Sequence, residues 1–166
     1  MYDRKSETPQ SRRMTPLKTL PTEHRTPRSR KMPFASGGQL VSAVTVRDVL
    51  AGKYPQRETV IVDCRFGYEY EGGHLPGALN FPPNSERALA SLLFDEGGPV
   101  SRAEASDNDA LVILHCEFSQ CRAPRMAAEL LKLGRQGIEV YVMKGGYAEF
   151  YRIFPSLCEP QGYTTM

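Results

Sequence analysis

Residues 111–134 read LVILHCEFSQCRAPRMAAELLKLG, a stretch that combines a strand, a loop and a helix. The first four residues are all apolar, which is typical of a strand buried on both faces of a parallel sheet. Pro124 stands in the first turn of the helix expected over residues 124–133, and Gly134 follows its end. The stretch therefore predicts a β–loop–α unit with Cys116 at the carboxyl end of the strand.

Short apolar segments and helical segments alternate on both sides of this unit. This alternation predicts an α/β fold with a central, mostly parallel sheet and helices on both faces. We expect Thr45 to be the N-cap of the first helix and Val100 to Asp109 to be a polar loop. The expected strands lie near Leu40 and at residues 60–64, 77–81, 111–116 and 138–143, and the expected helices at residues 45–51, 68–73, 85–94, 124–133 and 146–154.

Length and charge indicate two unequal parts. A chain of 166 residues with 40% hydrophobic content suits one domain with a real core. Residues 1–36 hold nine Lys or Arg against three Asp or Glu, whereas residues 37–166 hold twelve against sixteen. The first part has five prolines and no helical or strand periodicity. We therefore expect a disordered basic tail over residues 1–36 and a folded domain over residues 37–166.

Three Thr-Pro pairs punctuate the tail, at Thr8, Thr15 and Thr26. Thr15 stands in TPLK, the pattern that proline-directed kinases of the cell cycle prefer. These threonines are candidate phosphorylation sites, although a solvated Thr/Pro-rich leader would have the same composition. The basic stretch RTPRSRK at residues 25–31 is read as solubilising charge, with a nuclear-import patch as the alternative.

The four cysteines bear on the cellular compartment and on chemistry. No segment approaches the ~18 apolar residues that cross a membrane, and the N-terminus lacks a secretory signal. We expect a protein of the nucleus or cytoplasm, with no membrane or nucleic-acid partner and no cofactor. Cysteines there are reactive more often than they are structural disulfides. A zinc site is not expected, because only one close pair exists. The cysteines are Cys64, Cys116, Cys121 and Cys158.

The loop after the strand has the features of an anion site. In a parallel sheet, ligands bind beyond the carboxyl ends of the strands, where the next helix presents its N-terminus. Arg122 adds a planar two-pronged donor that matches two phosphoryl oxygens. The same donors favour the thiolate form of Cys116, which would then attack a bound phosphoryl group. The expected phosphate-binding residues are Glu117, Phe118, Ser119, Gln120, Cys121 and Arg122.

An inert role for the loop stays open at this point. A lone cysteine after a buried strand is commonly core, and a Cys-x5-Arg spacing also occurs by chance. His115 could orient the loop through a hydrogen bond, or it could fill space behind it.

Beyond the loop, four motifs together resemble the M-phase inducer phosphatases. HCEFSQCRAPRM resembles the signature of these dual-specificity enzymes, which activate cyclin-dependent kinases and have the rhodanese fold. The resemblance implies that Cys116 is the nucleophile of a phosphocysteine mechanism, that Arg122 clamps the phosphate, and that residues 68–74 support the fold near the site. The other three motifs are VIVDCRFGYEYEGGHLPGALN (60–80), VYVMKGGYAEFY (140–151) and LCEPQGY (157–163).

One position in the loop departs from the family. An acidic residue usually stands where this chain has Cys121. Glu117 is therefore nominated as the general acid for the leaving oxygen, with a loop carboxylate oriented by backbone contacts as the alternative. Sulfurtransferases of the same fold use a loop one residue shorter, so the five-residue interval favours phosphate.

Cys64 ends its strand as Cys116 does. If the two strands are neighbours they lie about 4.8 Å apart, within the ~4.4–6.8 Å between Cα atoms that a disulfide needs. By resemblance, Cys64 is similar to the family's back-door cysteine, which captures an oxidised nucleophile. We predict a reversible Cys64–Cys116 disulfide under peroxide, with Cys121 as a rival partner. Cys158 is expected to be buried packing.

Three function classes follow from the sequence. The first is a protein phosphatase for phosphotyrosine and phosphothreonine, with a cyclin-dependent kinase as substrate and further kinases acting on the tail. The second is an arsenate reductase, because related rhodanese-fold proteins use the same loop. The third is a phosphoprotein-binding module with little turnover.

Overall fold

The structure is a computed structural model that describes residues 40–55, 57–105 and 108–166. The expected tail and its candidate phosphorylation sites Thr8, Thr15 and Thr26 lie outside the described residues, so they stay predictions. Within the described part, no helix combines the length and the apolar character that a membrane crossing needs.

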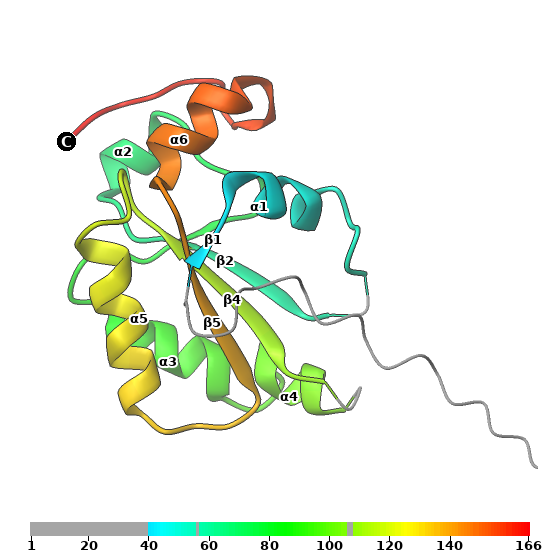
Figure 1. Ribbon diagram of the computed structural model, residues 1–166. Coiled ribbons are helices and arrows are strands. Elements are labelled where there is room, and N and C mark those ends of the chain that lie inside the picture. Colours follow the sequence, from blue (N-terminus) through cyan, green and yellow to red (C-terminus); the bar gives the residue numbers. More distant parts are fainter. Residues whose placement is uncertain (1–39, 56, 106–107) are drawn as a thin grey trace, which may run out of the picture.

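Five parallel strands form one sheet in the order β1-β5-β4-β2-β3 (Figure 1). All six residues of β4 are buried, which is what its run of apolar residues predicts for a central strand. Burying one large aliphatic side chain contributes roughly 1.5–3 kcal/mol, so this strand anchors the core. The strands are β1 Leu40–Val41, β2 Thr59–Asp63, β3 Leu79–Asn80, β4 Ala110–His115 and β5 Ile138–Met143.

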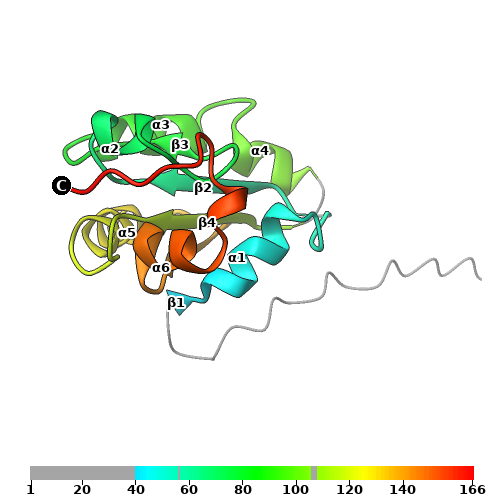
Figure 2. The same cartoon turned by 90° about the horizontal axis from the view of Figure 1, so that it is seen from above.

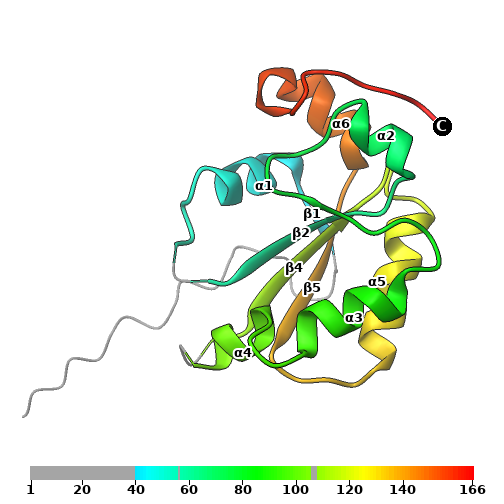
Figure 3. The same cartoon turned by 180° about the vertical axis from the view of Figure 1, so that it is seen from behind.

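Helices cover both faces of the sheet, as the sequence predicts (Figures 1 and 3). One face carries Val62 and Leu114, which pack in one cluster with residues of α3, α4 and α5. The other face carries Ile61 and Ile113, which pack with residues of α1 and α6. The helices are α1 Ala43–Leu50, α2 Gly67–Glu71, α3 Glu86–Phe94, α4 Pro99–Glu104, α5 Arg122–Lys132 and α6 Gly146–Ile153, with a short 3₁₀ turn at Pro155–Leu157.

The predicted N-cap of the first helix is wrong. α1 begins at Ala43, and Ser42 is its cap: the Ser42 Oγ accepts a hydrogen bond from the Thr45 backbone N–H at 3.1 Å. Ser and Thr both cap helices through a side-chain hydroxyl, with Ser somewhat preferred, so the local signal separates Ser42 from Thr45 only weakly. The packing of Ala43 and Val46 in the core selects the earlier start.

The predicted polar loop at Val100 to Asp109 is also wrong in its first half. Residues 99–104 form α4, with Pro99 in the first turn and Gly98 as cap residue. Val100 and Ala103 are spaced as one helical face and are both buried. Two small apolar residues among polar ones are a weak signal for a helix. The contact of these two side chains with the core stabilises α4.

The carboxyl ends of β2 and β4 meet at one edge of the sheet. Asp63 is the register partner of His115, and the Cys64 N–H donates to the His115 carbonyl oxygen at 2.8 Å. Figure 2 looks down on this edge, where α2, α6 and the C-terminal segment gather near the start of α5. Five buried polar or charged residues lie at this edge: Asp63, Arg65, Glu69, His115 and Glu117.

Candidate active site

The loop between β4 and α5 begins with a buried cysteine and ends with an arginine. Cys116 follows β4 directly and is only 3% exposed, while Arg122 is the first residue of α5. Ser119 has a positive φ of 54°, and its Oγ accepts from the Cys116 N–H at 3.4 Å. The structure therefore brings the predicted nucleophile and the predicted clamp to the two ends of one tight turn.

The back of the loop is fixed by the start of α6. The Tyr147 and Ala148 N–H groups donate to the carbonyl oxygens of Cys116 and Glu117, each at 2.9 Å. In a trans peptide the N–H points opposite to the C=O. The N–H groups of Glu117 and Phe118 consequently point away from α6, toward the open side of the loop. Two of the predicted main-chain donors are thus preset without any ligand.

Gly146 makes this approach of α6 to the loop possible. It has a φ of +60°, and a Cβ at this position would lie 2.4 Å from the Cys116 carbonyl oxygen. Real Cβ atoms do not approach backbone so closely, so any larger residue would push α6 and the loop apart.

Arg122 is held by a carboxylate from α2. Its Nη1 lies 2.5 Å from Glu69 Oε2 and its Nη2 lies 3.1 Å from Glu69 Oε1, a two-pronged pair. The guanidinium also lies 5.5 Å from the centre of the Phe66 ring. Burial works against the charged form of Arg122, but Glu69, with a contribution from Cys116, outweighs it and raises the Arg122 pKa. The arginine is therefore charged and fixed in orientation.

Sequence reasoning did not nominate Glu69. The residue is fully buried, and its Oε2 also accepts from the Phe66 N–H at 2.9 Å, which caps α2. Residues 68–74 were assigned only general support of the fold near the site. Glu69 and Arg122 are 53 residues apart, so neither spacing nor periodicity connects them. The YEYEGG motif was the available signal.

Glu117 is engaged on both carboxylate oxygens. Its Oε1 accepts a hydrogen bond from the Tyr163 hydroxyl at 2.9 Å, and its Oε2 lies 3.8 Å from Arg122 Nη2. The residue is 5% exposed. This geometry matches a carboxylate oriented by its contacts, although the partner is a tyrosine side chain and not the backbone. Glu117 as general acid stays a prediction.

A buried ionic group lies behind the loop. Arg65 Nη2 lies 2.6 Å from Asp63 Oδ2, and the Arg65 guanidinium sits 3.9 Å from the centre of the Tyr147 ring. His115 is fully buried, with Nε2 3.8 Å from Asp63 Oδ2. Burial lowers the pKa of His115 more than the nearby Asp63 raises it. His115 is thus neutral at pH 7 and packs behind Cys116 as part of this group.

Cys64 occupies the position beside Cys116 that the strand ends predict. It is 1% exposed, and burial, with smaller effects of Cys116 and Asp63, raises its pKa well above the ordinary value. Cys64 and the exposed Cys121 both line a cavity of about 160 Å³. The two predicted disulfide partners of Cys116, namely Cys64 and Cys121, therefore line the same cavity. Cys158 ends the 3₁₀ turn and is buried in the core, as predicted.

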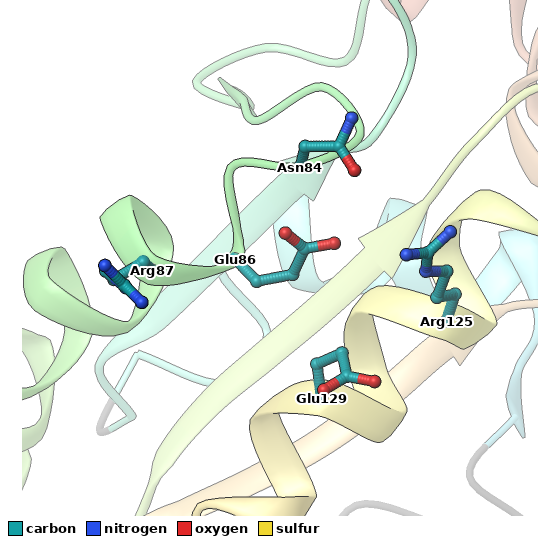
Figure 4. A pocket seen from close by; sticks show the side chains of 5 residues that line it. All are labelled: Asn84, Glu86, Arg87, Arg125 and Glu129. Carbon is teal, nitrogen blue, oxygen red and sulfur yellow. The ribbon is translucent and has the colours of Figure 1, made fainter.

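A larger pocket of about 570 Å³ adjoins this cavity (Figure 4). The two share Glu86, at the start of α3, and Arg125, one helical turn after Arg122. In the part of the chain that the structure describes, no three His, Cys, Asp or Glu side chains are grouped to hold a metal ion. Sequence reasoning did not foresee this pocket, whose lining residues are Asn84, Glu86, Arg87, Arg125 and Glu129.

Comparison with protein families identifies one match. The family model described as a rhodanese-like domain matches residues 46–153. M-phase inducer phosphatase 2 of Rattus norvegicus is 38% identical over 138 residues, which is 76% of this chain and 23% of that protein. The chain thus spans about a quarter of the length of the curated relatives it matches. The resemblance expected from the four motifs is confirmed.

Solved structures agree on the fold. A yeast protein tyrosine phosphatase of the rhodanese family has a TM-score of 0.60 at 21% identity, over 78% of this chain and 96% of that one. The As-Sb reductase of Leishmania major has a TM-score of 0.54 at 22% identity, over 72% and 83% respectively. Identities this low support a common fold and do not separate phosphatase from reductase chemistry.

Proposed function

The chain belongs to the rhodanese-like domain family, and from this premise we propose that it is a cysteine-dependent protein phosphatase. Its substrates are phosphotyrosine and phosphothreonine esters, and a cyclin-dependent kinase is the proposed protein substrate. The similarity to M-phase inducer phosphatases supports this choice of substrate. Kinases acting on the threonines of residues 1–36 are proposed as regulators.

One observation carries the proposal. Cys116 stands at the start of a loop whose Glu117 and Phe118 N–H groups point away from α6, and Arg122 closes that loop in an orientation fixed by Glu69. A dianion held by these donors would present its phosphorus to the sulfur, with its charge compensated by the guanidinium. This is the arrangement that in-line phosphoryl transfer requires.

The proposed chemistry has two steps. The Cys116 thiolate attacks phosphorus, a phosphorus–sulfur bond forms, and the bond to the leaving oxygen breaks. The leaving oxygen takes up a proton. Water then attacks the phosphocysteine and releases inorganic phosphate and the thiolate. For Glu117 to donate the proton in the first step, its carboxyl would have to be protonated and leave its contact with Tyr163.

Cys116→Ser tests the proposal. We expect hydrolysis of p-nitrophenyl phosphate to fall by at least about 1,000-fold, because a serine hydroxyl is a far weaker nucleophile at neutral pH. Inorganic phosphate should still bind, because the loop amides and Arg122 remain. The measurements are initial rates and titration calorimetry. Cys158→Ser is the matched control, because Cys158 is buried in the hydrophobic cluster on the opposite face of the sheet from that of Cys116.

Three results would contradict the phosphatase. Turnover that persists in Cys116→Ser would remove the nucleophile from its role. Thiol-dependent loss of arsenate without release of phosphate from a phosphopeptide would instead favour the reductase. Tight binding of a doubly phosphorylated peptide without any burst of phosphate would favour a binding module.

A further inference from the structure

The segment after the 3₁₀ turn lies against α2 and α6. Two backbone hydrogen bonds join His74 and Glu159, at 3.1 and 2.9 Å, and the Tyr147 hydroxyl donates to the Gly162 carbonyl oxygen at 2.7 Å. The packing is close: a Cβ on Gly73 would lie 2.1 Å from that same oxygen. The backbone on the N-terminal side of Tyr163 is therefore fixed, and Figure 2 shows this red segment running over α6 toward α2.

Tyr163 connects this segment to the loop. Its ring packs on Tyr147 and Tyr151, with 5.7 Å between ring centres in both cases. Its hydroxyl donates to Glu117 Oε1 at 2.9 Å. Burial first, and then Glu117, raises the pKa of Tyr163 to about 12. The tyrosine thus keeps its proton at neutral pH and remains a donor.

The partner of this hydroxyl carries a charge in an unfavourable place. Glu117 directly follows Cys116, and its second oxygen lies 3.8 Å from Arg122 Nη2. Glu69 already holds the same guanidinium with two contacts. A second carboxylate beside it competes with an incoming oxyanion and repels it. The Tyr163 hydroxyl bonds the other oxygen, and Glu117 Oε2 stands beyond hydrogen-bond length from Arg122 Nη2.

We infer that Tyr163 is a positioning residue: its hydroxyl holds the Glu117 carboxylate short of a hydrogen bond with Arg122, and so leaves the guanidinium to the phosphoryl group. The inference rests on the proposed function, because it concerns the same oxyanion site. It assigns a role to a side chain 41 positions beyond Arg122, on a segment that supplies no other contact to Glu117 among the described residues.

Tyr163→Phe is the first test, because it removes only the hydroxyl. We expect the dissociation constant of inorganic phosphate to rise about 10-fold, the size expected for losing one hydrogen bond to a charged group. Tyr151→Phe is the matched control: Tyr151 belongs to the same ring cluster, whereas the hydrogen bond to Glu117 comes from Tyr163. The control should change phosphate binding by less than about 2-fold, and thermal melting of both variants reports their folding.

Rescue distinguishes positioning from simple support of the fold. In Tyr163→Phe, the further change Glu117→Gln removes the negative charge, so phosphate affinity should return to within about 3-fold of wild type. A merely structural role for Tyr163 predicts no such recovery. A double variant that binds phosphate as weakly as Tyr163→Phe alone would overturn the inference.

The remaining outcomes are also decisive. If wild type binds no phosphate, the proposed function fails, and this inference fails with it. If wild type binds and Tyr163→Phe binds as tightly, only the inference fails. Should Tyr163→Phe not fold, Glu117→Gln alone decides: the inference expects phosphate binding at least as tight as in wild type, and weaker binding would overturn it.

Discussion

The front and the back of the loop between β4 and α5 differ in how firmly the fold holds them. At the back, the carbonyl oxygens of Cys116 and Glu117 are bonded to α6, and a tyrosine secures the Glu117 side chain. At the front, Phe118 is 52% exposed and Cys121 is also exposed. The back therefore sets the direction of the main-chain donors, whereas the front is open to a substrate.

This difference shows how a loop without a glycine-rich motif can present amides to an anion. The peptide units are oriented from behind, by hydrogen bonds to their carbonyl oxygens, so no ligand is needed to align the opposite N–H groups. Such preorganisation avoids reorganising the donors during the reaction. Substitutions at the back should then harm chemistry more than substitutions at the front.

The largest effect is expected for Gly146→Ala at the back. The added Cβ would stand 2.4 Å from the Cys116 carbonyl oxygen in a backbone with φ of +60°. The loop must shift, and a displacement near 1 Å costs about 100-fold in turnover. Initial rates on p-nitrophenyl phosphate measure the loss, and a melting curve checks the fold. Phe118→Ala, at the front, is the control and should change these rates by less than about 3-fold.

One outcome would contradict this difference between the back and the front of the loop. Equal losses in Gly146→Ala and Phe118→Ala would mean that the back of the loop has no special role in orienting the donors.

Oxidation tests the back and the front of the loop through the cysteine on each side. Cys64 lies behind the loop beside Cys116, and Cys121 lies at its front. Mild peroxide should form the Cys64–Cys116 disulfide, and dithiothreitol should restore activity. In Cys64→Ser the recoverable fraction should fall several-fold, because Cys116 proceeds to the sulfinic acid. Peptide mass mapping identifies the bonded pair.

Cys121→Ser is the matched variant for this experiment. If Cys64 is the partner of Cys116, the loss of Cys121 should leave the recoverable fraction of activity unchanged. Recovery that depends on Cys121 and not on Cys64 would reverse the assignment.

The smallest effect is expected from the buried histidine. Burial lowers the pKa of His115, so the unfolded chain binds more protons than the folded one just below the ordinary value of about 6.5. Stability is then lost as pH falls through 6.5. Between pH 7.5 and 5.5 we expect wild type to lose about 1 kcal/mol more than His115→Gln. Urea unfolding at both pH values measures the difference, and an equal loss in both proteins would remove His115 as the cause.

Much of the fold was predictable because its signals are local. The apolar run at residues 111–114, the β–loop–α unit that follows it and the alternation of strands and helices predict the parallel sheet. The errors concern weak local signals: Ser42 and Thr45 can both cap through a hydroxyl, and α4 buries only Val100 and Ala103 besides Pro99. At both places packing decided between alternatives of similar local energy.

The site divides in the same way. The two ends of the loop, Cys116 and Arg122, follow from the sequence alone. The place of Cys64 beside Cys116 followed only on the condition that their strands are neighbours, and the structure supplies that pairing. The contacts that hold these residues became visible only in the folded structure. Glu69 pairs with Arg122, Tyr163 bonds Glu117, and Gly146 allows α6 to approach the loop backbone. The physical reason is sequence distance. A strand end and a helix start follow from neighbouring residues, whereas a contact across 46 or 53 positions exists only once the chain has closed around its core.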